Sequence, residues 1–185
     1  MPKRWILAAA MPLASAMNCP GSSAWIHAST QVEAMAASSC QQVKEEIRAR
    51  VDPKSGWHDP HNGGTYTMLA DNGHNIFELS RQTGDKRYTD KMTFTFSNHG
   101  TSSCAIEACS ESQVFSIADF STNYCNLRNL YCGAEDGCQV VRYDFTTEET
   151  NINPSFGAGV DKSACIVAGG TPSMFSKHWA TTTDF

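Results

Sequence analysis

Eight cysteines constrain this chain of 185 residues more than any other feature. All of them lie beyond residue 16, and their number is even: Cys19, Cys40, Cys104, Cys109, Cys125, Cys132, Cys138 and Cys165. In an oxidising compartment such a set predicts up to four disulfides, although spacing alone leaves the pairing open. A structural zinc site would instead favour paired Cys-x-x-Cys knuckles, which this chain lacks. We therefore expect a disulfide framework and no metal at these thiols.

The first 16 residues predict the compartment. Lys3 and Arg4 precede the apolar run Trp5–Leu13, and the small residues Ala14–Ala16 follow. This order is typical of a secretory signal peptide, and the apolar run is shorter than the roughly 20 residues that a membrane-spanning helix needs. We expect a signal peptide over residues 1–16, a secreted or otherwise extracytoplasmic protein, and no membrane span in the mature chain. A buried N-terminal helix is the alternative interpretation.

The balance of charges limits the partners. The chain has 14 basic and 19 acidic residues, a formal net charge of −5, and no cluster of Lys and Arg. A nucleic-acid binder needs a basic surface, so we expect no nucleic-acid partner. Asparagine-linked glycosylation is not expected either, because the one near match to its acceptor motif, Asn153-Pro154-Ser155, contains the excluded proline.

Composition along the chain predicts one domain with two irregular flanks. Residues 17–29 show no hydrophobic period and are interpreted as a lead-in arm. Residues 30–150 carry periodic segments and predict an α+β domain. Residues 151–185 are rich in Gly, Ser, Thr and Pro, which indicates an irregular tail held by Cys165.

An amphipathic helix is predicted at the start of this domain. Thr30-x-x-Glu33 and Ser39-x-x-Gln42 both have capping-box spacing, so a helix begins at one or both places. Asp52–Pro53 ends it, because proline disfavours helical geometry in the residue before it. The apolar stripe that follows the helical period comprises Ala36, Cys40, Val43, Ile47 and Val51.

Beyond Pro53 the period changes to that of β-strands. Asp71-Asn72-Gly73 predicts a hairpin turn, because Asn-Gly accepts the positive φ of a tight turn. Strands are expected at 66–70, 75–82, 88–97, 105–117 and 138–147, while Tyr124–Tyr131 is ambiguous between strand and helical turn. One N-terminal helix on an antiparallel sheet of four to six strands makes a two-layer, disulfide-stabilised α+β fold.

This order of elements resembles the cystatin-type roll over residues 30–147. The resemblance implies a sheet wrapped around one helix. The inhibitory Gln-x-Val-x-Gly loop of that family is missing, since the nearest string, Gln139–Tyr143, ends without glycine. Protease inhibition is therefore not implied.

The densest polar cluster lies between Trp57 and Tyr66. Two imidazoles three residues apart, with a carboxylate between them, can ligate a metal or act as acid and base. The alternative is that they are exposed turn residues, and no third ligand stands at a recognisable spacing. We therefore expect ligand binding here and no metal. The candidate residues are Trp57, His58, Asp59, His61, Asn62 and Tyr66.

A second candidate segment is rich in asparagine and aromatic residues. Such side chains combine directional hydrogen bonds with flat apolar faces, which suits carbohydrate or peptide recognition. The alternative is a disulfide-tied loop whose asparagines bond to the backbone. The candidate ligand-binding residues are Asn123, Tyr124, Asn126, Arg128 and Tyr131.

Together these features predict a secreted, disulfide-stabilised binding or structural module without a catalytic centre. Its expected partner is a protein, a peptide or a carbohydrate, and no cofactor is expected. The alternative is a small secreted hydrolase, metal-dependent or acid/base, that uses His58-Asp59-x-His61. The sequence leaves the choice between enzyme and binding module open.

Overall fold

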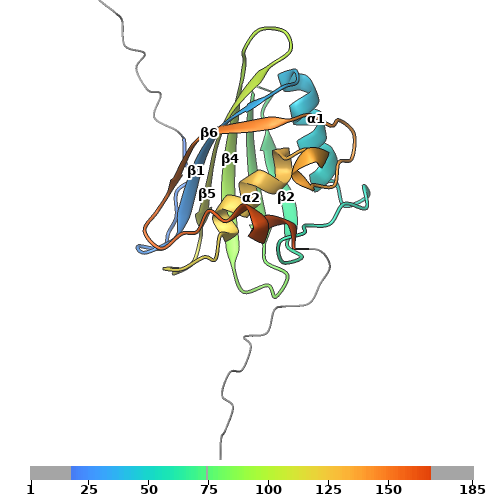
Figure 1. Cartoon of the computed structure of the whole chain (residues 1–185). Helices are drawn as coiled ribbons and strands as arrows, with labels where there is room; N and C mark the ends of the chain where they lie inside the picture. Colours follow the sequence, from blue (N-terminus) through green and yellow to red (C-terminus); the bar gives the residue numbers. More distant parts are fainter. Residues whose placement is uncertain (1–17, 74, 168–185) are drawn as a thin grey trace, which may run out of the picture.

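In the computed structural model, residues 18–73 and 75–167 are described. They form a mixed α and β domain in which two helices lie against one six-stranded, fully antiparallel sheet (Figure 1). The sheet order is β2-β3-β4-β5-β1-β6. The elements are β1 (Ser29–Ala36), α1 (Cys40–Val51), β2 (Thr65–Asp71), β3 (Ile76–Gln82), β4 (Thr89–Asn98), β5 (Cys104–Ser112), α2 (Thr122–Tyr131) and β6 (Thr147–Pro154), with short 3₁₀ helices η1 (Ala134–Asp136) and η2 (Lys162–Ile166).

The first regular element is a strand, so the prediction that a helix comes first is wrong. Thr30, Val32, Ala34 and Ala36 are buried and alternate with less buried residues along β1. This strand pairs with β5 on one side and β6 on the other. Hydrogen bonds to two neighbouring strands and burial of every second side chain favour a strand over a helix in this segment.

The helix α1 begins nine residues later than the first capping-box motif, at Thr30, suggests. Ser39 is its N-cap, and the Ser39 hydroxyl accepts a hydrogen bond from the backbone N–H of Gln42. The helix ends before Asp52, its C-cap residue. Cys40, Val43 and Ile47 form its buried face, whereas Ala36, which we placed in the same stripe, belongs to β1.

Consecutive hairpins join β2 to β5. In β4, Met92, Phe94 and Phe96 are buried, as the alternation predicts. The next strand, β5, ends at Ser112 and does not continue to Ile117. The segment that was ambiguous in sequence, Tyr124–Tyr131, is helical and lies within α2.

The predicted strand at 138–147 is wrong, since this segment has no regular structure before Thr147. The backbone N–H groups of Val141, Arg142 and Tyr143 donate to the Glu46 carboxylate of α1 instead of to a neighbouring strand. The strand β6 then runs to Pro154, past residue 151, where we placed the start of the irregular tail.

The predicted signal peptide, residues 1–16, lies outside the described residues.

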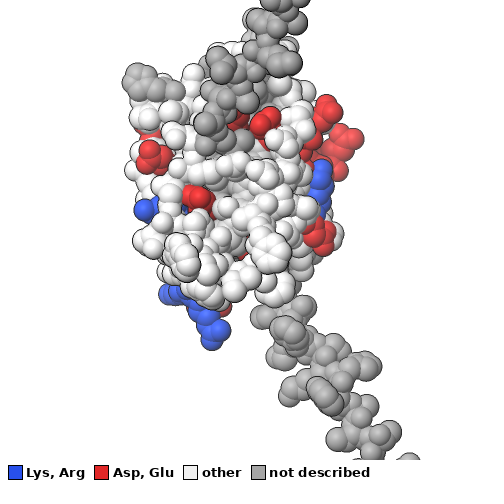
Figure 2. All heavy atoms as spheres, turned by 90° about the vertical axis from the view of Figure 1, so that its left-hand side faces the viewer, with Lys and Arg blue, Asp and Glu red and all other residues white. Residues whose placement is uncertain are grey.

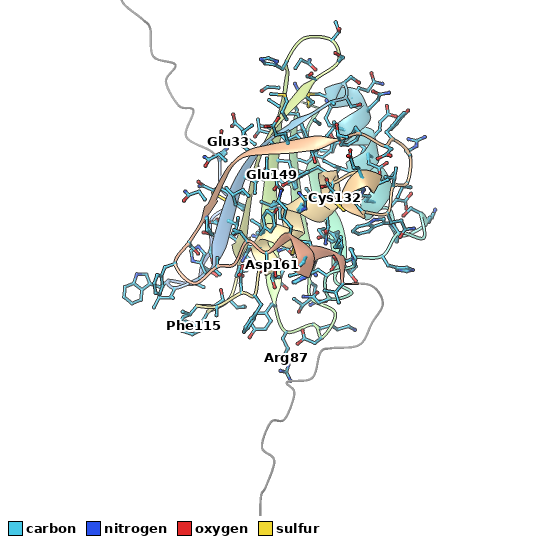
Figure 3. The ribbon with its side chains drawn as sticks, in the orientation of Figure 1. Glu33, Arg87, Phe115, Cys132, Glu149 and Asp161 are labelled. Carbon is cyan, nitrogen blue, oxygen red and sulfur yellow. A yellow bond between two sulfur atoms is a disulfide. The ribbon has the colours of Figure 1, made fainter. Side chains whose placement is uncertain are left out.

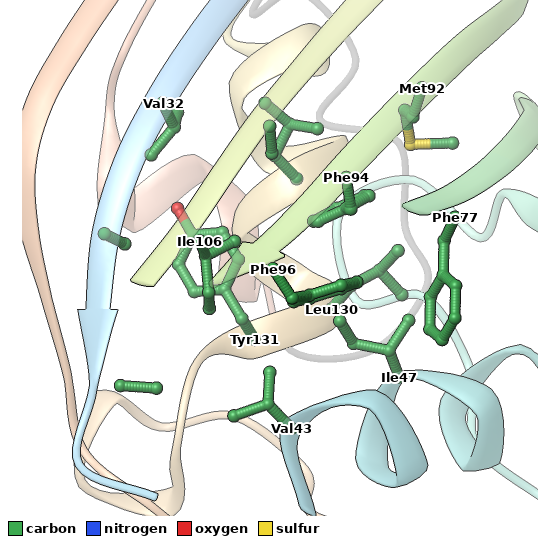
Figure 4. Packing of buried hydrophobic residues seen from close by; sticks show 14 of the residues in the cluster. Val32, Val43, Ile47, Phe77, Met92, Phe94, Phe96, Ile106, Leu130 and Tyr131 are labelled. Atoms are coloured by element: carbon green, nitrogen blue, oxygen red, sulfur yellow. The ribbon is translucent and has the colours of Figure 1, made fainter. Parts of the chain in front are cut away.

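The core lies between the helices and the inward face of the sheet (Figure 4). Phe77 and Phe96 meet edge to face, with ring centroids 5.1 Å apart, and Ile47 of α1 is buried in the same cluster. Tyr131 and Leu130 of α2 are fully buried as well. Both helices therefore contribute to one continuous apolar layer.

Four disulfides fasten the elements to one another, which confirms the predicted framework and is typical of extracellular proteins. Two of them join helices to their surroundings: one links the start of α1 to the start of β5, and one links α2 to η2. Another ties the segment before β1 to β5, and the last closes the loop after α2. The pairs are Cys19–Cys109, Cys40–Cys104, Cys125–Cys165 and Cys132–Cys138.

Neither α1 nor α2, nor any other helix among the described residues, is long and apolar enough to cross a membrane.

Removing the Cys40–Cys104 disulfide should cost more stability than removing Cys132–Cys138. The two bonds close loops of 64 and 6 residues, and loop-closure entropy makes the longer cross-link worth about 2 kcal/mol more. We expect Cys40→Ala/Cys104→Ala to unfold at a lower guanidinium concentration than Cys132→Ala/Cys138→Ala. Equal midpoints would contradict this ranking.

Candidate functional site

Asp59, the carboxylate of the predicted His-Asp-x-His cluster, is buried and fully engaged. It pairs with Arg81 of β3 and accepts hydrogen bonds from the N–H of Gly64 at 2.9 Å and the side-chain amide of Asn129 at 3.1 Å. Burial alone would raise the pKa of Asp59, but the Arg81 charge and these donors outweigh it and leave the pKa lowered. Asp59 therefore holds the loop before β2 against β3 and α2.

The two histidines of this cluster do not converge on a common ligand. His61 contacts the carbonyl oxygen of Ala164 through Nδ1 at 2.7 Å and the Thr122 hydroxyl through Nε2 at 3.2 Å. His58 is exposed. Among residues 18–73 and 75–167, the one group of metal-ligating atoms close together is Cys19, Cys109 and Glu111, and its cysteines are joined in a disulfide. Disulfide sulfurs are not thiolate ligands.

The other residues of the first segment have structural partners as well. Trp57 donates its indole N–H to the carbonyl oxygen of Gln139 at 3.2 Å and meets Tyr66 edge to face. The Tyr66 hydroxyl donates to the carbonyl oxygen of Asn126. The Asn62 side-chain oxygen accepts from Arg81. The segment thus docks on β3 and α2.

The second candidate segment is α2, and the structure places all of it inside the protein. Every residue from Asn123 to Tyr131 is buried. Asn123 accepts from the Ser110 hydroxyl at 2.7 Å, and Asn126 donates to the Asp90 carboxylate at 2.8 Å. These amides form a polar layer between α2 and the sheet.

Three further residues of α2, namely Tyr124, Arg128 and Tyr131, surround Glu149 of β6, whose side chain is nearly inaccessible (Figure 3). Tyr131 donates to this carboxylate at 2.7 Å and Tyr124 at 2.8 Å, while Arg128 and Lys162 pair with it at 2.9 Å. Burial acts to raise the pKa of Glu149, but the Lys162 contact and the other donors leave it lowered. The cluster fastens β6 and η2 to α2.

Two depressions on the described surface are open and lined mainly by polar side chains. One, of about 510 Å³, lies beside the start of α1 and is lined mainly by Ser, Thr, Gln and Glu side chains. A second, of about 390 Å³, lies near the end of α1. Neither contains a residue from the two candidate segments. Ligand pockets are ordinarily more enclosed and more apolar than these.

The distinctive surface of the described chain is an apolar one at the end of the sheet where β5 finishes. It consists of large side chains on three neighbouring loops, and two of them, Trp25 and Phe156, are each 95% exposed. Figure 3 shows Phe115 at this end of the molecule, projecting from the loop after β5. We name this surface the loop-end patch: Trp25, Ile26, Phe115, Ile117, Phe120 and Phe156.

Backbone contacts hold the three loops side by side. The N–H of Ser116 donates to the carbonyl oxygen of Ile26, and the Ser116 hydroxyl accepts from the N–H of Ala28 at 2.8 Å. Gly157 lies so close to Ile117 that a Cβ atom at this position would collide with the Ile117 carbonyl oxygen. The patch is therefore a single surface assembled from segments distant in sequence.

Phe120 stands in a strained backbone conformation within this patch. Its φ is 50°, in the left-handed region that bulky residues rarely occupy, while its side chain is 77% exposed. The buried carboxylate of Asp119 holds the turn by accepting from the N–H groups of Ser121, Asn123 and Gly159 at 2.9 to 3.1 Å. Strain of this kind persists where surrounding contacts enforce it and is frequent at binding sites.

The sequence interpretation missed this patch because its residues follow no period. Trp25 and Ile26 fell in the predicted lead-in arm, Phe115 and Ile117 in a predicted strand, and Phe156 in the predicted tail. The available signal was local: each aromatic side chain stands among Ser, Ala or Gly residues, without the alternation that a buried strand would show.

No family model, no curated protein and no solved structure matches this chain. The predicted order on which the resemblance to the cystatin-type roll rested, one helix followed by strands, is not the observed order, since β1 comes first and a second helix, α2, follows β5.

Glu46 should make stability depend on acid pH. Burial opposes its ionisation, but the N–H groups of residues 141–143 and the Arg50 side chain outweigh burial and lower the pKa of Glu46. A lowered carboxyl pKa contributes stability above the unfolded value of about 4.3, and this contribution is lost as pH falls through the folded value. Glu46→Gln should therefore cost about 3 kcal/mol at pH 7 and clearly less at pH 3, measured by urea unfolding.

Glu148→Gln is the matched control for this measurement, because Glu148 is exposed on β6. It should change stability by less than about 0.5 kcal/mol at either pH. A Glu46→Gln deficit that is the same at both pH values would contradict the role assigned to the buried carboxylate.

Phe120→Gly should leave stability nearly unchanged, although replacing an aromatic residue by glycine is ordinarily costly. Glycine relieves the positive φ, which offsets its greater flexibility in the unfolded chain, and little buried surface is lost. The expected change is below about 1 kcal/mol, measured by thermal or denaturant unfolding.

Asp119→Ala is the contrasting variant, because it leaves several buried N–H groups without an acceptor. It should cost about 2 kcal/mol or more. If Phe120→Gly proved as damaging as Asp119→Ala, Phe120 would be a packing residue and not a surface residue held in place.

Proposed function

We propose that this protein is a secreted, disulfide-stabilised binding module without a catalytic centre, and that it meets its partner through the loop-end patch. One observation carries this proposal: six large apolar side chains are exposed together on three mutually bonded loops. Contiguous exposed apolar surface on a folded protein marks an interaction site, because it is otherwise a liability for solubility.

The design of the scaffold supports a binding role. Two of the four disulfides anchor segments that flank the patch: Cys19 precedes Trp25, and Cys165 follows Phe156. Surfaces that are already ordered lose less conformational entropy on binding, which favours affinity. Secretion, predicted from residues 1–16, agrees with a fold that depends on disulfides.

The hydrolase alternative has less support. A general base must reach a substrate proton, and a metal ligand must offer a free lone pair. Asp59 is enclosed by Arg81 and its other donors, and both His61 nitrogens have protein partners. Asp59 and His61 therefore connect parts of the fold, and His58 is exposed.

The chemistry of the patch narrows the partner. Its side chains offer apolar and aromatic contact and few hydrogen-bonding groups, which suits an apolar surface better than a phosphate backbone. A protein, a peptide or the flat face of a sugar ring could supply such a surface, and nucleic acid is not proposed.

The test compares the wild-type protein with Trp25→Ser/Phe115→Ser/Phe156→Ser. The control variant is Leu69→Ser, which removes a half-exposed apolar residue from the far edge strand β2. Immobilised wild-type protein and control should retain a partner from the native extracellular fluid, and the triple variant should bind at least about 100-fold more weakly. The three side chains contact little, so unfolding midpoints should agree.

Equal retention by all three proteins would contradict the proposed surface. Metal analysis of purified protein addresses the alternative function with the variants His58→Ala and His61→Ala. A bound metal that either substitution removes would overturn the absence of a catalytic centre and favour the hydrolase.

A further inference from the structure

The loop-end patch is bordered by a cationic turn. The β3–β4 turn carries Lys86 and Arg87, and the Arg87 side chain is 79% exposed (Figure 3). Tyr88 and Val114, both partly exposed, connect this turn to the loop after β5, because the N–H of Gln113 donates to the carbonyl oxygen of Thr89. In Figure 2, the lower part of the face formed by the β6 and β1 edge is largely uncharged, with Lys and Arg atoms at its lower rim.

The three loops of the patch carry few acidic groups: Asp161, at the end of the third loop, is exposed and accepts hydrogen bonds from Ser163. Residues 22–26 and 155–160 contain no Asp or Glu, and the one carboxylate of residues 113–120 is that of Asp119, which is buried. Beside the cationic turn, Asp85 bonds the Thr83 hydroxyl at 2.6 Å and the N–H of Arg87 at 3.1 Å. In the cationic turn, Lys86 and Arg87 outnumber the one carboxylate, that of Asp85, which is 55% exposed and pairs with Arg87 at 3.7 Å.

Much of the loop backbone already has partners within the protein. Ser116 and Ile26 bond to each other, the N–H of Ala158 bonds to Ser155, and the N–H of Gly159 bonds to Asp119. Backbone groups that are satisfied internally can leave water with little loss, whereas unpaired ones resist transfer into an apolar layer. These bonds hold the loops together while the side chains at their tips contact a nonaqueous layer.

Two side chains of the patch project freely from their loops. At 95% exposure, Trp25 and Phe156 make almost no contact with the rest of the protein. Anchors at a protein–protein interface are normally packed against neighbours in a flat or hollow surface. Isolated aromatic tips suit a soft layer that closes around each side chain, and Trp and Phe favour the boundary between lipid headgroups and acyl chains.

We propose that the loop-end patch docks on a phospholipid membrane, with the aromatic tips in the headgroup and upper acyl region and with Lys86 and Arg87 against anionic headgroups. This proposal rests on the proposed function, and it assigns a lipid surface to the patch in place of a protein, a peptide or a sugar. Electrostatic attraction to anionic lipid adds to apolar insertion, so both sets of residues contribute. The protein lies on the bilayer surface through its loops.

The test is flotation of the purified, disulfide-intact protein with vesicles of phosphatidylcholine alone or mixed equally with phosphatidylserine. We expect binding to the mixed vesicles, and at least about 100-fold weaker partitioning for Trp25→Ser/Phe115→Ser/Phe156→Ser. Leu69→Ser should bind as the wild type does. Quenching of Trp25 fluorescence by lipids brominated on the acyl chains, absent in Trp25→Phe, reports insertion of the tip.

A second set of variants tests the cationic turn in the same flotation experiment. Lys86→Glu/Arg87→Glu should reduce binding to the mixed vesicles at least about tenfold and leave binding to phosphatidylcholine unchanged, whereas Lys54→Glu, exposed after α1, should change neither. Loss of binding to both kinds of vesicle in the charge variant would overturn the assigned role of the turn.

Failure of this proposal differs from failure of the binding function. If the wild type floats with neither kind of vesicle but retains an extracellular protein through the patch, the membrane proposal is wrong and the binding module stands. Flotation that the triple variant preserves would overturn the docking surface. If neither vesicles nor any extracellular component depend on the patch, both proposals are wrong.

Discussion

Buried carboxylates determine how the irregular half of this chain is arranged. Glu46, Asp59, Asp119 and Glu149 are each largely inaccessible, and each accepts hydrogen bonds from segments that belong to no strand. A charge removed from water is costly unless it receives a nearly complete set of donors. Each carboxylate thus requires the surrounding loops to bring their N–H groups or cations to one place, and this requirement fixes loop conformations that backbone preferences alone would leave open.

The effect of a buried carboxylate is clearest at residues 141–143, where the Glu46 carboxylate binds N–H groups that the local sequence would place in a strand. Residues 141–143 alternate in a way that suits a strand, yet their N–H groups converge on Glu46, which also pairs with Arg50 at 2.8 Å. Arg50 in turn donates to the carbonyl oxygens of Asn129 and Cys132, so one ion pair joins α1, the end of α2 and the loop before β6. Disulfides fasten the same elements covalently, and the carboxylates fix their finer geometry.

The parts of the fold that sequence reasoning predicted are those set by local patterns. The cap at Ser39 and the alternation of β4 require only residues adjacent in sequence, and both agree with the structure. The N-terminal strand was misassigned because Val32 and Ala36 fit a helical stripe and a strand face equally well. Their pairing partners in β5, Ala108 and Cys104, are distant in sequence and decide between the two. The burial of α2 on all sides removes the amphipathic signal that normally identifies a helix, so its polar residues were interpreted as a binding segment.

The loop-end patch was missed because the exposure of its side chains cannot be predicted from hydrophobic periodicity along the sequence. A lone aromatic residue in a loop has the same sequence appearance whether it folds into the core or stands in solvent, and the outcome depends on what the loop is bonded to. At Phe120 the neighbouring Asp119 carboxylate accepts hydrogen bonds from the N–H groups of Ser121 and Gly159, while the aromatic side chain is exposed. A bulky exposed residue in left-handed geometry contributes little to folding, so contacts that maintain it favour a role outside the folded chain itself. The buried Asp119 carboxylate and the exposed apolar side chains therefore act together. The carboxylate accepts hydrogen bonds from the N–H groups of the loops on the inner side, and the outer side of the loops presents apolar side chains.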